Sequence, residues 1–206
     1  MKRFGLFLVT LACVLNLSAG DDPRPNIVLM VADDLGWTGL GSYGSEFYET
    51  PNLDRLASEG VKFTSAYAAA ANCAPSRASI MSGQYTPRHG VLYVGPGTYQ
   101  IKYEKKHGNL KRFKMIQPPG ETTLAPEIKT IADALQEGGY RTGMFGKWHL
   151  GLQENHPSQR GFDVAIESHG SHFGYSTDPE VTGEKPKYLS DFLSDQGAKF
   201  IRESSG

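Results

Sequence analysis

The feature that most constrains the fold of this 206-residue chain is a short, unbroken apolar run at residues 26–31 (NIVLMV). Its apolar side chains do not alternate with polar ones, a pattern typical of a parallel strand that is buried on both faces. Asp33 and Asp34 follow almost directly, at the carboxyl end of the predicted strand. Because active sites of open α/β sheets lie outside that end of the strands, the run predicts an α/β fold with a site near the two aspartates.

Helical and strand patterns alternate along the rest of the chain. Helices are predicted from Thr50-Pro51 to a stop at Gly60, and at residues 75–82, 130–137 and 189–202. Strands are predicted at residues 61–67 and 140–145. This alternation predicts a mainly parallel sheet sandwiched by helices. Residues 151–183 are rich in Gly, His, Ser and Pro without periodicity, and are predicted to form an active-site loop.

Residues 1–20 have the pattern of a signal peptide. Lys2 and Arg3 precede an apolar run of about 14 residues, which is too short to span a bilayer, and small residues follow it. An uncleaved N-terminal anchor is one alternative, and a lipoprotein signal at Cys13 is another, although Thr10 fits a lipid-attachment box poorly. We expect cleavage near residue 20, export to the periplasm or exterior without stable membrane insertion, and a folded part at residues 21–206.

The charge of the chain gives little reason to expect a nucleic-acid partner, since the formal net charge is -1. Charge gathers locally at residues 99–115, where Glu104 is the single acid. The basic residues there are Lys102, Lys105, Lys106, Lys111, Arg112 and Lys114. This stretch is interpreted either as a solvated surface loop or as a rim that attracts an anionic polymer.

Cys73 is the one cysteine left after removal of the predicted signal peptide, so an internal disulfide is excluded. Such a residue is buried and inert, paired with another chain, or chemically special. It lies just before a predicted short helix, with Arg77 one turn further on. A thiol, a helix N-terminus and a guanidinium can together stabilise an anion. A small core cysteine beside a surface arginine is the structural alternative.

Four stretches resemble signatures of the type I sulfatases, in the order in which that family carries them. Residues 73–77 (CAPSR), continuing to Gly83, are similar to its Cys-x-Pro-Ser-Arg signature. Residues 139–151, which end in GKWHLG, resemble a second signature. Residues 25–36 resemble its N-terminal strand and metal-binding aspartates, and residues 50–57 also fit. The resemblance implies an alkaline phosphatase-like α/β fold and a sulfuric ester hydrolase.

The resemblance also implies a role for each matched residue. Cys73 is oxidised to formylglycine by a formylglycine-generating or anaerobic sulfatase-maturating enzyme, and the aldehyde hydrate becomes the nucleophile. Arg77 orients this gem-diol, Lys147 holds a sulfate oxygen, and His149 is the base that releases sulfate. Lys147 and His149 lie two residues apart, so they share a face of an extended segment. Without the resemblance, these two residues could equally be a surface pair.

Ligands for a metal and for sulfate come from the same resemblance. Asp33, Asp34 and the formylglycine oxygen at Cys73 are expected to bind Ca²⁺ or Mg²⁺, since these cations prefer hard oxygen ligands. Ser171 and His172 follow the family's Gly-Phe at residues 161–162 and are expected to contact sulfate. Spacing alone would equally allow Ser168 and His169.

Parts of the family pattern are absent from this sequence. Two carboxylates and one further oxygen do not complete a shell of about six to eight oxygens. The family supplies an Asp-Asn pair, another Lys and another His further downstream. We therefore expect an N-terminal portion of a sulfatase domain, with a sheet incomplete at the C-terminus and an incomplete or inactive site. The substrate would be a sulfated small molecule or a sulfated glycan. The alternatives are a phosphonate or phosphate ester hydrolase of the same superfamily, and a non-catalytic truncated remnant.

Overall fold

The computed structural model describes residues 24–95, 104–109, 111, 113–115, 118, 120–181 and 188–204. The predicted signal peptide, Cys13, and Lys102 and Arg112 of the basic stretch lie outside these residues. The chain forms two compact units, Met1–Asp33 and Asp34–Gly206. Within the described ranges, no helix combines the length and the apolar character that a bilayer crossing requires.

The predicted strand at residues 26–31 is not formed. Residues 24–32 have no regular secondary structure, and the five apolar side chains from Ile27 to Val31 are 41–68% exposed. A strand buried on both faces needs hydrogen-bonded neighbours and covering layers. The sheet of the described residues does not include this segment, so the prediction is wrong in this structure.

The second unit contains a three-stranded sheet in the order β1-β2-β3. Its strands are β1 (Gly143–Gly146), β2 (Val164–His169) and β3 (Ser176–Asp178). β1 and β2 are parallel, and β2 and β3 are antiparallel. The α/β class and the strand predicted at residues 140–145 are confirmed. The sheet is mixed because β3 follows β2 through a short connection, which only an antiparallel pair permits.

The loop predicted at residues 151–183 is largely wrong. This stretch contains β2 and β3 together with the short helices η2 (Gln153–Asn155) and η3 (Pro157–Gln159). Residues 165–168 of β2 are all buried, as expected for a strand between two neighbours. Its short length and its Glu-Ser ending hide the apolar character that marks a buried strand.

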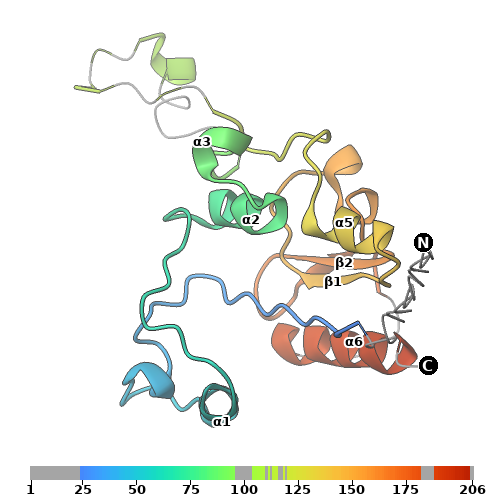
Figure 1. The fold of residues 1–206 in the computed structure, drawn as a ribbon. Helices are drawn as coiled ribbons and strands as arrows, with labels where there is room; N and C mark the ends of the chain where they lie inside the picture. The colour runs from blue at the N-terminus through green and yellow to red at the C-terminus, as the bar shows by residue number, and fades with distance from the viewer. Residues whose placement is uncertain are drawn as a thin grey trace, which may run out of the picture. The chain divides into compact units, whose positions relative to one another are not determined.

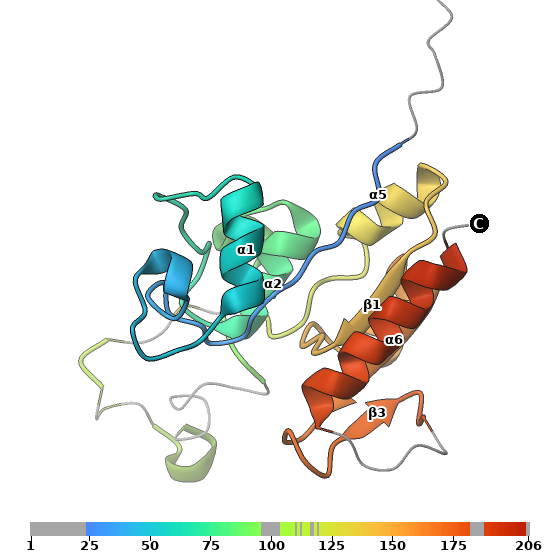
Figure 2. The same cartoon turned by 90° about the horizontal axis from the view of Figure 1, so that it is seen from below.

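Two helices cover the two faces of the sheet. In Figure 1, α5 (Ile131–Glu137) lies above β1 and β2, and α6 (Leu189–Ser204) lies below them. In Figure 2, where the molecule is seen from below, α6 lies in front of β1. α6 contributes Phe200, whose ring centroid lies 5.6 Å from that of Phe145 on β1. The helices predicted at residues 130–137 and 189–202 are thus confirmed.

The remaining helices lie earlier in the second unit. They are η1 (Gly41–Tyr43), α1 (Pro51–Glu59), α2 (Cys73–Ser82) and α3 (Thr86–His89). α1 begins at Pro51 and stops before Gly60 as predicted. Residues 61–67 form no strand, and Val61 and Tyr67 are 81% and 90% exposed. Side chains hold this segment in place of a β-ladder, since Tyr43 Oη donates to the Phe63 carbonyl at 2.7 Å.

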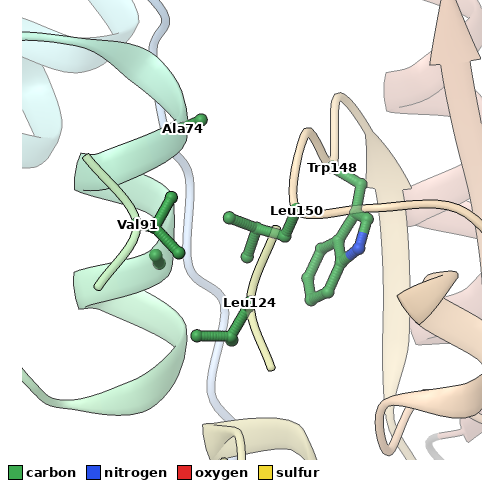
Figure 3. Close-up of a cluster of buried hydrophobic side chains, with 6 residues drawn as sticks. Ala74, Val91, Leu124, Trp148 and Leu150 are labelled. Carbon is green, nitrogen blue, oxygen red and sulfur yellow. The ribbon is translucent and has the colours of Figure 1, made fainter. Parts of the chain in front are cut away.

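The core of the second unit connects α2 with the segment that follows β1. Ala74 and Ala78 of α2 pack with Val91, Leu124, Trp148 and Leu150. Figure 3 shows Trp148 and Leu150 on one side of this cluster and Val91 and the α2 residue Ala74 on the other. The Trp148 indole N–H donates to the Asn155 carbonyl at 2.6 Å, so its polar atom is satisfied within the core.

Arg160 is a buried residue, only 2% exposed, that connects two further segments of this unit. Its guanidinium donates to Asn155 Oδ1 at 2.7 Å and to the carbonyls of Leu124 and Ile128 at 3.1 and 2.7 Å. A further bond of 3.4 Å reaches the Ala125 carbonyl. Burial lowers the pKa of Arg160, but guanidinium remains charged in proteins. A buried cation thus ties residues 124–128 to the 153–160 region.

His89 is a buried histidine whose neighbours favour the neutral ring. Its Nδ1 accepts from the Val91 backbone N–H at 3.1 Å, and its Nε2 lies 2.9 Å from Ser79 Oγ. An accepting Nδ1 carries no proton, so Nε2 is the donor to Ser79. Protonation would break the bond to Val91, and burial lowers the pKa of His89.

The protein is therefore expected to lose stability as pH falls below about 6.5, the ordinary histidine value. The unfolded chain gains a proton there, whereas folded His89 resists it until its lowered pKa is reached. The slope reaches about 1.4 kcal/mol per pH unit for one group. Urea unfolding across this range measures it. His89→Gln should flatten the slope, whereas His107→Gln at an exposed position should not; an unchanged slope in His89→Gln would contradict the assignment.

Candidate active site

Cys73 is the first residue of α2, and two features of the sequence place it there. Asn72 adopts an extended conformation before the helix, and Gly83 ends the helix in a left-handed conformation with φ 66°. Ala74 and Ala78 are spaced by one turn and face the core. Cys73 and Arg77 have the same spacing on the neighbouring face and are half-buried. The helix begins slightly before the predicted residue 75, which puts Cys73 itself in the first turn.

Lys147 and His149 follow the carboxyl end of β1. Burial alternates along this segment: Trp148 and Leu150 are buried, whereas Lys147 and His149 are half-buried. This alternation is consistent with Lys147 and His149 lying on the same side, but, contrary to the prediction, the segment is not extended at His149. His149 has a positive φ of 65°, a conformation that is unfavourable for a residue with a Cβ atom.

Arg77 connects α2 to this segment. Its Nη1 donates to the Lys147 carbonyl at 2.5 Å. The guanidinium expected to lie beside Cys73 therefore also holds the backbone between Lys147, the predicted sulfate-binding residue, and His149, the predicted base. Together with the shared core, this bond brings the elements that carry Cys73, Arg77, Lys147 and His149 into one place in the second unit.

Ser171 and His172 follow the carboxyl end of β2, the parallel neighbour of β1. Gly146 pairs with Glu167, so the two strands end at the same edge of the sheet. Both residues are exposed. Ser171 Oγ donates to the Phe173 carbonyl at 2.5 Å. The His172 ring stacks on the Tyr188 ring, with 5.4 Å between the two ring centroids. The position of the segment after β2 puts it at this edge of the sheet, and the His172 ring contacts Tyr188, the residue before α6.

Asp33 and Asp34 lie at a turn, both are exposed, and Asp34 has φ 55°. They belong to different units of the chain. Their carboxylates suit a hard divalent cation. Among the residues that the structure describes, however, no three Asp, Glu, His or Cys side chains gather in a way that would hold a metal ion. The described residues therefore do not build a complete metal site.

Glu167 is a residue of this region that sequence reasoning missed. It is only 4% exposed, and burial raises the pKa of its carboxyl. The His149 backbone N–H donates to this carboxylate and opposes the rise, as does nearby His169, with Nε2 3.9 Å from Glu167 Oε2. The pattern of β2 gave no signal for it, because a charged residue is not expected inside a buried strand.

Comparison with known proteins decides the family. A family model described as Sulfatase matches residues 25–206, nearly the whole chain. This chain belongs to the sulfatase family. The sulfatase resembles curated relatives across most of its own length. It is 43% identical to arylsulfatase G of Rattus norvegicus over 169 residues, 81% of this chain and 27% of the relative.

Other sulfatases give the same picture. Identity to N-acetylgalactosamine-6-sulfatase of Rattus norvegicus is 38%, covering 82% of this chain and 30% of the relative. Identity to steryl-sulfatase of Mus musculus is 44%, covering 70% and 22%. The chain thus spans less than a third of the length of these relatives.

Solved structures support the fold. The crystal structure of Ps i-CgsB matches with a TM-score of 0.69 at 29% identity, covering 87% of this chain and 41% of that one. The structure of BT4656 in complex with its substrate D-glucosamine-2-N,6-O-disulfate matches with a TM-score of 0.64 at 27% identity, covering 87% and 31%. These matches confirm the alkaline phosphatase-like α/β class for the sulfatase described above.

Proposed function

We propose that this sulfatase contributes the nucleophile and the sulfate-binding groups of a sulfuric ester hydrolase. The observation that carries the proposal is the Arg77–Lys147 bond, because it joins the helix that begins at Cys73 to the segment that carries Lys147 and His149. A nucleophile at a helix N-terminus, a guanidinium, an ammonium and an imidazole are the groups that transfer of an anionic ester requires.

In the proposed reaction, Cys73 is first oxidised to formylglycine by a formylglycine-generating or anaerobic sulfatase-maturating enzyme, which supplies the oxidant. One hydroxyl of the aldehyde hydrate loses its proton and attacks sulfur, the S–O bond to the substrate breaks, and the leaving oxygen takes up a proton and departs as the alcohol. His149 then removes the proton of the second hydroxyl. The electron pair re-forms the aldehyde and expels sulfate. Arg77 orients the diol, and Lys147 holds a sulfate oxygen.

The substrate is proposed to be a sulfated small molecule or a sulfated glycan. The names of the aryl and steryl relatives support the first, and the disulfated glucosamine bound to BT4656 supports the second. Ser171 and His172, at the same sheet edge as Lys147, are proposed to contact the ester sulfate. The divalent ion is proposed to be Ca²⁺ or Mg²⁺, with Asp33 and Asp34 among its ligands. Export after cleavage near residue 20 belongs to the same proposal.

Two measurements on the exported chain, co-expressed with a maturating enzyme, test this function. Conversion of Cys73 is expected to lower the intact mass by about 18 Da. Release of sulfate from an aryl sulfate is expected to exceed release of phosphate from the matching aryl phosphate. Faster phosphate release would favour the phosphate or phosphonate ester hydrolase. An unmodified Cys73 without sulfate release would favour the non-catalytic remnant and overturn the proposal.

A further inference from the structure

Glu167 carries a buried carboxylate, and the stability of the fold does not explain why a charged residue stands at this position. It stands directly beside Gly146 in the parallel register of β1 and β2, with its side chain 5% exposed. Among the described residues, its Oε2 atom has no hydrogen-bond partner. A buried carboxylate that is incompletely hydrogen-bonded lowers stability, so an uncharged residue would suit β2 better on stability grounds.

The groups that surround Glu167 do not neutralise it fully. His169 follows on the same strand, with Nε2 3.9 Å from Glu167 Oε2. Asp178 stands opposite Glu167 on β3 and raises the pKa of its carboxyl further, whereas His156 lowers it. His156 is itself close to Asp178, with Nε2 3.8 Å from Oδ2. His156 thus acts on both carboxylates, whereas His169 lies beside Glu167.

The bond to the His149 backbone has a consequence for the candidate site. The segment after β1 is held at Lys147 by Arg77, at the Trp148 indole by Asn155, and at the Leu150 carbonyl by the Leu124 N–H at 3.0 Å. His149 lies between these anchors in the left-handed region. Such a conformation is unfavourable for a residue with a Cβ atom and persists only where neighbours hold it. The Glu167 carboxylate holds it at the peptide N–H.

We propose that Glu167 is a positioning residue of the candidate site. By binding the His149 N–H, its carboxylate fixes the left-handed turn and so sets the direction in which Lys147 and His149 project. This role rests on the proposed function, since it matters for substrate only if those two side chains bind and release sulfate. Glu167 itself touches no reacting atom.

Amide NMR of the full chain tests the geometric part without any need for activity. The His149 amide signal is expected to shift as Glu167 titrates, at a pH above the ordinary value of 4.5. Glu167→Gln keeps an acceptor and should abolish this titration while leaving the His149 signal near its wild-type position. Glu167→Leu removes the acceptor and should move the signals of both Lys147 and His149. Glu154→Gln, at an exposed position of η2, is the matched control and should change neither.

Titration with inorganic sulfate, followed in the same spectra, tests the link to the site. Affinity is expected to fall about tenfold in Glu167→Leu and to be retained in Glu167→Gln. A His149 amide signal that shifts neither with pH in the wild type nor in Glu167→Leu would overturn the proposal. If Glu167→Leu does not fold, the pH titrations of wild type and Glu167→Gln decide: the same His149 response in both would overturn it. Sulfate binding that is equal in all folded variants would also overturn it. Absence of sulfate binding in wild type, with the amide response intact, would instead count against the proposed function.

Discussion

Replacement of Arg160 by methionine is expected to lower the free energy of unfolding by about 3–5 kcal/mol, because removing one partner from a buried charged network leaves the others unsatisfied. Methionine has a similar length but no donor. The carbonyls of Leu124 and Ile128 and the side-chain oxygen of Asn155 would lose their hydrogen bonds in a dry environment. Urea unfolding at constant pH measures the change as a shift of the midpoint.

Arg55 provides the matched control for this substitution. It lies on α1 with a side chain that is 73% exposed and a 4.0 Å ion pair to Glu59. Arg55→Met should change stability by no more than about 0.5 kcal/mol, as is usual for an exposed pair. If Arg160→Met cost as little as Arg55→Met, the buried network would not be a significant source of stability.

Replacement of Cys73 by alanine is expected to lower sulfate ester hydrolysis by at least about 10³-fold, since the proposed nucleophile is then absent. Alanine suits the first turn of a helix, so folding should be nearly unchanged. The intact mass of the variant should show no conversion in the presence of the maturating enzyme. Sulfate release from an aryl sulfate, with the urea midpoint as a check on folding, measures the effect.

Ser82→Ala at the opposite end of α2 is the control for Cys73→Ala. The Ser82 hydroxyl donates to the Ala78 carbonyl at 2.6 Å within its own helix and accepts from the Gln84 N–H at 3.3 Å just beyond it. Its loss should leave the rate within about twofold of wild type, because the change is small and far from the reacting groups. Wild-type hydrolysis by Cys73→Ala would rule out the formylglycine mechanism for this chain.

The helices were largely predictable from the sequence, because their signals are local. Thr130 begins α5 with a capping box to Asp133, and Gly83 ends α2. The strands were less predictable, since an apolar run becomes a strand only when neighbours supply its hydrogen bonds. Residues 26–31 and 61–67 have the composition of strands without such neighbours, whereas β2 has the neighbours and a less typical composition.

The candidate site was likewise predictable only in part. Cys73, Arg77, Lys147 and His149 were predicted from motifs, and the structure brings the two segments that carry them together through Arg77. Glu167 could not be predicted, because its importance depends on the register of β2 beside β1. The hydrogen bond from Arg77 to the Lys147 carbonyl could not be predicted either, because every residue type carries a backbone carbonyl.

The exposed apolar run at residues 26–31 has a consequence for solubility. Uncharged segments of high β propensity associate edge to edge with copies of themselves unless charges or prolines flank them. Pro25 precedes the run, and Asp33 and Asp34 follow it. We therefore expect the two aspartates to act as gatekeepers against aggregation. An alanine substitution at either position would lower the yield of soluble protein independently of metal binding, so its effect on activity is interpretable only per mole of soluble, monomeric chain.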